Sequence, residues 1–186
     1  MSAREIARAV DALRRGGVVA FPTESSFGLA VDALDERALA KLIAVKGRPE
    51  GKPPPVLVDG EEMARTLVRE IPPRAREWMA AHWPGGLTLV LPARDGLPPS
   101  LVEDGCVGVR APSHPIAAAL VRAFGAPLTA TSANRSGDPA AQNASEAALP
   151  GVDLVLEGRA WGAAPSTVVR VRGDQWEILR RGAIDL

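Results

Sequence analysis

Lysine is rare in this chain, and its positions are the first sign of a chemical site. Of the 22 Lys plus Arg residues, only Lys41, Lys46 and Lys52 are lysines, all within KLIAVKGRPEGK at 41–52. In KGRP, Lys46 and Arg48 are two positions apart in a stretch that contains glycine and proline. The ammonium and the guanidinium can therefore both point at one phosphate. The alternative is that they cap the carbonyls of a preceding helix and face water, and Lys41 fits an ordinary exposed helix position.

A second polar segment, TSANRSG at 131–137, offers three hydroxyls, a side-chain amide and a glycine within seven residues. Such a segment can turn sharply and present N–H groups to phosphate oxygens. The alternative is an ordinary polar turn between strands. Asn134 is one of two asparagines in the chain, which favours a specific role.

A third polar segment, PTESSFGL at 22–29, is predicted to be a loop. It places Thr23 and Glu24 directly after a buried strand, whereas Phe27 is more typical of a core position. All three segments leave the end of a predicted strand or helix. Because ligands of open α/β sheets bind at such ends, we hypothesise that the three segments converge. The G-x-x-x-x-G-K-[ST] and G-x-G-x-x-G signatures are absent from the sequence, so a nucleotide would need an unfamiliar cradle.

The composition limits the other classes of function. Lys plus Arg and Asp plus Glu each number 22, so the chain offers no strong overall field to nucleic acid and an anion site must be local. Two histidines, one cysteine and the lack of closely spaced His, Asp and Glu argue against a zinc or iron centre held by protein alone. Cys106, in a strand-like segment, is more typical of a small buried hydrophobe than of a nucleophile.

The hydropathy of the chain indicates a soluble globular protein. The hydrophobic fraction is 46%, the mean hydropathy is +0.03, and no apolar run approaches the roughly 20 residues of a membrane span. The charged N-terminal segment MSAREIARAVDALRRGG does not resemble a signal peptide. We therefore expect a cytoplasmic protein without membrane contact.

Hydrophobic periodicity predicts the elements that position the polar segments. The predicted helices cover 3–15, 36–45, 60–69, 73–82 and 115–124. The predicted strands cover 18–21, 55–58, 87–91, 106–110 and 127–131, with three more in VDLVLEG, STVVRV and WEILRR. Helices and strands interleave without a repeat, which predicts a single-domain α/β fold with a mixed sheet.

Taken together, the segments are similar to those of a known family. PTESSFGL, KGRP, WPGGLTLVLP, VGVRAPSHP, TSANRSG, PSTVV and LRRGAI occur in the order and approximate spacing of the YrdC/Sua5 family, the threonylcarbamoyl-AMP synthases. The resemblance runs from about Val18 to Ala183. It implies a twisted α/β fold with flanking helices and a concave, positively charged cleft. Since longer Sua5 members continue into a second domain, it also implies that 1–186 is a single YrdC-like domain without that addition.

The resemblance further implies a reaction. L-threonine, bicarbonate and ATP, with Mg²⁺ carried by the ATP, would give threonylcarbamoyl-adenylate and pyrophosphate. A separate tRNA-modifying transferase would then pass the threonylcarbamoyl group to adenosine 37 of tRNAs that read codons beginning with A.

The family's functional residues carry over by position. The K-x-R and S-x-N signatures and LRRGAI imply ATP contacts at Lys46, Arg48, Ser132, Asn134 and Arg180. The threonine contacts implied are Thr23, Lys52, Arg110 and Ser166. Lys46 and Arg48 are also the implied catalytic residues, because they would neutralise the repulsion between two anions that must meet. Phe27 stands where many members have Tyr, which removes a hydroxyl contact.

Two alternatives stay open. The first is an RNA-binding or ribosome-maturation module that binds backbone phosphates in the same cleft, or a synthase that also binds RNA weakly. The second is a carbamoyl-adenylate-forming relative, as in hydrogenase maturation proteins, or a member of the YciO branch. The zero net charge counts against the RNA module, and the intact K-x-R and S-x-N signatures favour adenylate formation.

Overall fold

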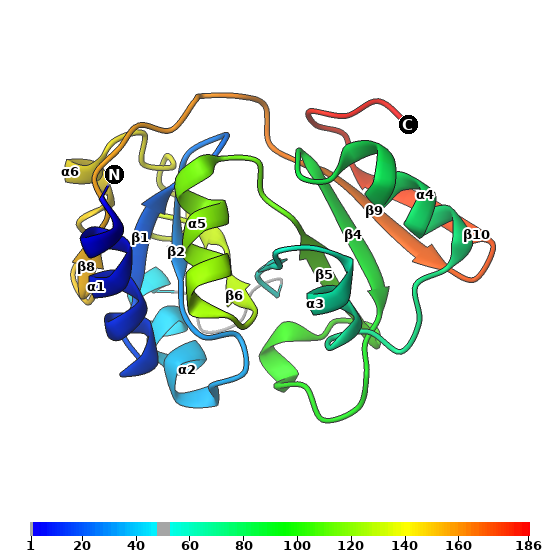
Figure 1. Cartoon of the computed structure of the whole chain (residues 1–186), viewed down its shortest axis with the longest axis horizontal. Coiled ribbons are helices and arrows are strands. Elements are labelled where there is room, and N and C mark those ends of the chain that lie inside the picture. Colours follow the sequence, from blue (N-terminus) through cyan, green and yellow to red (C-terminus); the bar gives the residue numbers. More distant parts are fainter. Residues whose placement is uncertain (1, 48–52) are drawn as a thin grey trace.

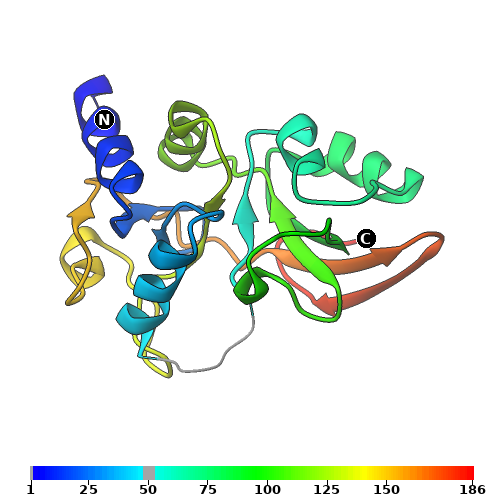
Figure 2. The ribbon, with the colours of Figure 1, turned by 90° about the horizontal axis from the view of Figure 1, so that it is seen from below.

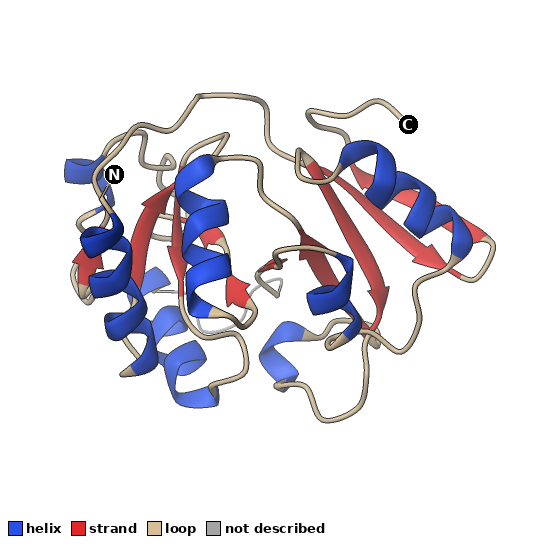
Figure 3. Ribbon diagram, viewed as in Figure 1, coloured by secondary structure: helices blue, strands red, loops and turns tan. Residues whose placement is uncertain are grey.

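Two twisted sheets stand side by side in the molecule, each with helices packed against it (Figures 1 and 3). The computed structural model describes residues 2–47 and 53–186. Within these residues, the smaller sheet has the strand order β7 (Thr131–Ser132), β2 (Phe27–Ala30), β1 (Val19–Pro22), β8 (Leu154–Val155). The larger has the order β10 (Gln175–Arg180), β9 (Thr167–Arg172), β4 (Leu87–Pro92), β5 (Cys106–Arg110), β3 (Val56–Leu57), β6 (Leu128–Thr129).

Both sheets mix parallel and antiparallel pairs. β1 runs parallel to β8 and antiparallel to β2, while β4 runs parallel to β9 and antiparallel to β5. The predicted mixed α/β fold with flanking helices is therefore confirmed. The sequence did not indicate that the strands would divide between two sheets.

The division takes place within the predicted strand 127–131. Its first part, β6, pairs with β3 of the larger sheet, and its second part, β7, pairs with β2 of the smaller sheet. Two hydrogen bonds of Thr129 stabilise this crossing. Its Oγ1 accepts from Val31 N at 3.0 Å, and its N–H donates to Val31 O at 3.0 Å. A single stretch of backbone thus belongs to both sheets.

The prediction that 22–29 is entirely a loop was wrong for its second half. Phe27 begins β2, which forms an antiparallel hairpin with β1 in a register that pairs Pro22 with Phe27. The turn consists of residues 23–26. Thr23 closes it, because its N–H and its Oγ1 both donate to Ser26 O, at 3.0 and 2.7 Å. Phe27 is fully buried, so a hydrophobic strand resumes immediately after a short polar turn.

Helices α1 (Ala3–Arg14) and α5 (Pro115–Phe124) cover the smaller sheet and pack against each other and β1. The C-terminal end of α2 (Glu36–Lys46) lies near β7, and its N-terminus is capped, as its sequence suggests, by Asp35 Oδ1, which accepts from Arg37 N and Ala38 N. A short α6 (Ala144–Ala147), which was not predicted, follows the 131–143 segment.

Helix α4 (Pro73–His82) covers one face of the larger sheet, as Figure 2 shows from below. In the chain, the short α3 (Glu61–Arg65) precedes α4, and the 3-10 turn η1 (Pro99–Leu101) lies between β4 and β5. Leu87, Leu89 and Leu91 of β4 are fully buried. Because side chains alternate along a strand, Thr88 faces the opposite side of the sheet.

None of the helices formed by residues 2–47 and 53–186 has the length and apolarity that crossing a bilayer requires.

Candidate functional site

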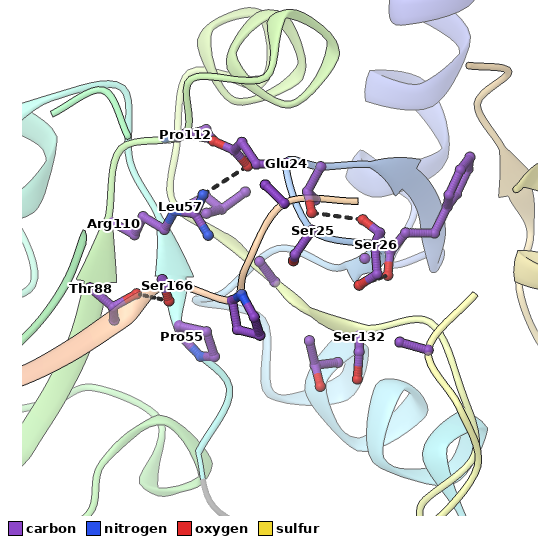
Figure 4. Close-up of a pocket in the computed structure, with 18 of the residues that line it drawn as sticks. Glu24, Ser25, Ser26, Pro55, Leu57, Thr88, Arg110, Pro112, Ser132 and Ser166 are labelled. Atoms are coloured by element: carbon purple, nitrogen blue, oxygen red, sulfur yellow. Dashed lines mark hydrogen bonds and ion pairs between the residues drawn. The ribbon is translucent and has the colours of Figure 1, made fainter. Parts of the chain in front are cut away.

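A pocket of about 670 Å³ lies between the two sheets, a volume typical of small-molecule sites. Its lining comes from the β1–β2 turn, from β7, from the cleft-facing sides of β3, β4 and β5, and from the segment before β9 (Figure 4). Predicted site residues that line it are Thr23, Ser132, Arg110, Ser166 and Arg180. Two of the three polar segments therefore meet there, and Lys46 of the third contacts Ser132.

Lys46 reaches the pocket wall from the last residue of α2. The helix stops there because Gly47 adopts a left-handed conformation (φ 64°) that is easy only for glycine. Lys46 Nζ donates to Ser132 O at 2.6 Å and to Asn134 Oδ1 at 2.9 Å. Ser132 Oγ donates to the same Asn134 oxygen at 2.5 Å. The K-x-R lysine and the S-x-N pair thus form one cluster.

Arg48 and Lys52, which were assigned to ATP and threonine respectively, lie outside the described residues. Lys41 keeps the ordinary surface role, since its ammonium pairs with Asp153 at 2.6 Å and its side chain is 40% exposed.

Arg110 lies at the end of β5, opposite the smaller sheet. Its Nε donates to Gly85 O at 2.8 Å, and its Nη2 forms an ion pair with Glu24 Oε2 at 2.8 Å (Figure 4). Glu24 Oε1 accepts from Ser113 N at 2.6 Å, Ser113 Oγ at 2.9 Å and His114 N at 3.2 Å. Burial alone would raise the pKa of Glu24, but the Arg110 charge and the Ser113 donors hold the pKa below its ordinary value of 4.5.

Arg180 and Ser166 form a second polar unit on the larger sheet. Arg180 Nε and Nη2 donate to Ser166 O at 3.0 and 2.9 Å, and Nη2 also donates to Ser166 Oγ at 3.0 Å. Ser166 Oγ lies 2.8 Å from Thr88 Oγ1. Burial, and then the charge of Arg110, lower the pKa of Arg180. The groups assigned separately to nucleotide and to threonine are therefore joined by hydrogen bonds.

Glycine makes this second unit possible. A Cβ at Gly182 would collide with the Pro165 carbonyl oxygen and with the Ser166 backbone. The backbone after β10 consequently lies directly against Pro165 and Ser166, which brings Arg180 onto the pocket.

Thr23 and Phe27 lie on the smaller-sheet side. The Thr23 hydroxyl donates to Ser26 O, so it stabilises the hairpin turn as well as lining the pocket. Phe27 is fully buried and also contributes to the lining.

Glu24 and Thr88 are among the polar residues of the pocket that were not predicted as site residues. Glu24 is only 7% exposed although it is charged. The available signal was a carboxylate directly after a buried strand. For Thr88, the signal was a lone hydroxyl within an otherwise apolar strand, LTLVL.

The charged side chains among the described pocket-lining residues are Arg110, Arg180 and Glu24, which sum to a formal charge of +1. Lys46 adds a further positive charge behind Ser132. The arrangement can receive an anion, with hydroxyl and amide groups from both sheets beside the charges.

The chain is similar in sequence and in structure to proteins of one known family. The model of the Sua5/YciO/YrdC family, described as telomere recombination, matches residues 11–182. The threonylcarbamoyl-AMP synthase of Bacillus subtilis is 38% identical over 186 residues, covering 97% of this chain and 54% of the relative. That of Vibrio cholerae serotype O1 is 39% identical over 183 residues, covering 94% and 96%.

Among solved structures, the crystal structure of P. abyssi Sua5 complexed with L-threonine matches with a TM-score of 0.91 at 34% identity, covering 98% of this chain and 55% of that one. The chain thus spans about half the length of the Bacillus subtilis and P. abyssi proteins, and nearly all of the Vibrio cholerae protein. Family model, relatives and fold agree, and the chain belongs to the Sua5/YciO/YrdC family.

Proposed function

We propose that this chain is an L-threonylcarbamoyladenylate synthase, a nucleotidyltransferase that joins L-threonine, bicarbonate and ATP and releases pyrophosphate. The product would serve the t6A modification of adenosine 37 in tRNA through a separate threonylcarbamoyl transferase. The observation that carries the proposal is a pocket with arginines on one wall and a lysine directly behind the facing wall, in a chain whose relatives bear the name of this enzyme.

We assign the ATP phosphates to the Lys46, Ser132 and Asn134 cluster. An ammonium can donate hydrogen bonds in three directions, and Lys46 lies among neutral oxygen acceptors of Ser132 and Asn134, beside the pocket. One cation–phosphate contact at about 4 Å and an effective dielectric near 20 is worth roughly 4 kcal/mol before desolvation is subtracted. Arg48, two residues on, is expected to add a second cation.

We assign the threonine carboxylate to Arg110, and the rest of the amino acid to Ser166, Thr23 and Lys52. A guanidinium matches a carboxylate with two parallel hydrogen bonds. Arg180 is assigned to the nucleotide, and its hydrogen bonds to Ser166 would place the two substrates next to each other.

The chemistry would proceed in two steps. The threonine amine, once deprotonated, attacks the carbon of CO2 and releases a proton to solvent, or attacks bicarbonate with loss of water, and either route gives a carbamate. A carbamate oxygen then bonds to the α-phosphorus of ATP as the bond to the β-phosphate oxygen breaks, which releases pyrophosphate. Because two anions must meet, the protein's contribution is positioning and charge neutralisation by Lys46, Arg48 and Arg180.

Mg²⁺ would enter with the ATP. In the described residues no group of three His, Cys, Asp or Glu side chains could hold a metal ion, and the pocket carboxylate Glu24 is already paired with Arg110. The phosphate oxygens and water suit Mg²⁺ without a dedicated protein site.

Pyrophosphate release tests the proposal. Purified protein receives ATP and Mg²⁺, with L-threonine and bicarbonate added separately and together. We expect release only when both are present, with a product heavier than AMP by the threonylcarbamoyl group. Release without threonine, or none despite ATP binding, would overturn the proposal. A steeply salt-dependent RNA affinity without turnover would instead favour the RNA-binding alternative.

A further inference from the structure

Glu24 is a charged residue that is almost completely buried, and packing alone does not explain this position. Its side chain is 9% exposed, it lies on the turn of the β1–β2 hairpin, and both of its oxygens are engaged. It belongs to the smaller sheet, whereas its partner Arg110 belongs to the larger. The ion pair therefore joins the two walls of the pocket (Figure 4).

The two carboxylate oxygens of Glu24 have different tasks. Oε1 receives the N–H and hydroxyl of Ser113 and the N–H of His114, which fixes the turn before α5. Oε2 is buried and makes no hydrogen bond within the described residues, so the Arg110 ion pair is its compensation. A carboxylate in this position is oriented by one oxygen and holds Arg110 with the other.

The constraints on Arg110 leave specific donors available. Arginine has five N–H groups. One, on Nε, is bound by Gly85 O, and one amino group, Nη2, is held by Glu24. The guanidinium plane is thereby fixed by the larger sheet on one side and the smaller sheet on the other. Within the described residues, both N–H groups of Nη1 and the second N–H of Nη2 remain for a ligand, and together they can form two parallel hydrogen bonds to a carboxylate.

We infer that Glu24 is a positioning residue, which orients the Arg110 guanidinium so that its remaining donors can take a substrate carboxylate, and which also holds the two walls at a fixed spacing. The inference rests on the proposed function for the identity of that carboxylate, the one of L-threonine. A preorganised guanidinium binds a carboxylate more tightly, because its side chain is already ordered and binding costs less conformational entropy.

Glu24→Gln is the informative substitution. The amide oxygen can still accept from Ser113 and His114, so the turn before α5 is retained, while the NH2 group that faces Arg110 has no charge to hold it. We expect the dissociation constant for L-threonine, measured by calorimetry, to rise about tenfold or more, and that for ATP to change less than about threefold.

Asp153→Asn is the matched control. Asp153 is also a carboxylate that accepts a backbone N–H, from Val18 at 2.6 Å, and pairs with a cation, Lys41, but it does not line the pocket. It should leave threonine affinity unchanged. Equal losses of threonine and ATP affinity in Glu24→Gln, matched by the loss of thermal stability, would overturn the inference in favour of a merely structural role.

Nuclear magnetic resonance of the arginine side chains gives a readout that is independent of the reaction. In the wild type, restricted rotation about Cζ–Nη2 should give separate Nη proton signals for Arg110, identified by their loss in Arg110→Lys. In Glu24→Gln they should merge into an averaged signal, like that of the exposed Arg4.

The outcomes separate the two proposals. Averaged Arg110 signals in the wild type, or separate signals retained in Glu24→Gln, overturn the positioning role whatever the substrate is, and the wild-type spectrum decides this even if the variant does not fold. If the signals merge in Glu24→Gln but the wild type shows no threonine-dependent pyrophosphate release, the positioning role stands and the proposed function fails.

Discussion

The two walls of the pocket hold their cations in different ways. On the smaller-sheet side, the end of α2 carries Lys46 to neutral oxygens of Ser132 and Asn134, which lie 86 and 88 positions away in the sequence. On the larger-sheet side, Arg110 and Arg180 extend from strands and are held by a carboxylate and by strand-adjacent backbone. A compact ammonium can move with a phosphate that changes position, whereas a planar guanidinium suits a group that must stay still. The pocket thus combines one adaptable wall with one fixed wall.

Lys46→Ala should give the largest effect and tests the adaptable wall. Loss of a charge-stabilising donor typically lowers kcat by about 10² to 10³-fold, and we expect adenylate formation to fall by that amount. Pyrophosphate release measures it, and circular dichroism checks the fold. Lys41→Ala, in the same helix, is the control and should retain activity. If Lys46→Ala instead unfolds the protein, the cluster serves stability and the contrast between the walls disappears.

Arg110→Lys tests the fixed wall. The substitution keeps the charge but loses the planar fork, so we expect the KM for L-threonine to rise about tenfold while the KM for ATP stays nearly unchanged. Arg122→Lys, at an exposed position of α5 away from the pocket, is the control. A fully active Arg110→Lys enzyme would show that charge alone is sufficient on this wall, as it is for an ammonium on the other.

Ser166→Ala and Thr88→Val ask whether the fixed wall acts as a unit. Ser166→Ala removes a hydroxyl that contacts both Arg180 and Thr88 but leaves the Ser166 carbonyl contact to Arg180. At about 1 kcal/mol for one hydrogen bond, we expect roughly a fivefold loss of kcat/KM, with both substrates affected. Thr88→Val should cost less, about two- to threefold. Steady-state kinetics on both substrates decides this, and an effect of Ser166→Ala confined to ATP would separate the two groups.

Asp153 lies outside both walls of the pocket, and Asp153→Asn should have the smallest effect of these substitutions. The Lys41–Asp153 pair is about 40% exposed, so solvent screening limits its contribution to about 1 kcal/mol or less of unfolding free energy. Burial would raise the pKa of Asp153, yet the Lys41 and Val18 hydrogen bonds keep it below its ordinary 3.8. Since a depressed folded-state pKa stabilises above the unfolded pKa, the difference between wild type and variant should be full at neutral pH, begin to shrink below about 3.8, and be lost as pH falls through the lower folded-state pKa. Urea unfolding across pH measures the difference, and one that stays constant as pH falls from neutral into the acid range would contradict the assignment.

Local patterns predicted the helices well and the sheets less well. The apolar spacing and the capping residues are local signals, so 73–82 and 115–124 coincide with α4 and α5. The split of 127–131 between two sheets depends on what β3 and β2 offer as partners, which no local pattern contains. Arg110 was predicted as a site residue, but Glu24 was not. The Ser113 donors and the Arg110 charge that compensate for the burial of this carboxylate lie about 90 residues away in the sequence.

The site residues were found through the family resemblance more than through their surroundings. Lys46, considered locally, could equally have been a helix-capping cation, and its contacts with Ser132 and Asn134 are what join the two polar segments. Thr88 could have been found from strand alternation alone. Its sequence neighbours Leu87 and Leu89 face one side of β4, so the Thr88 hydroxyl must face the other.

The backbone from Leu128 to Ser132 pairs with the larger sheet at one end and with the smaller sheet at the other. Ala130, between them, lines the pocket and donates its N–H to Pro55 O at 2.8 Å. The width of the pocket is therefore set by chain length as much as by side chains. Inserting or deleting one residue at Ala130 would shift the register of β6 or β7 and displace Ser132 relative to Arg110 by up to about 3 Å, the rise of one residue in a strand. This five-residue crossing therefore fixes the spacing between Ser132 on one wall and the strands that carry Arg110 on the other.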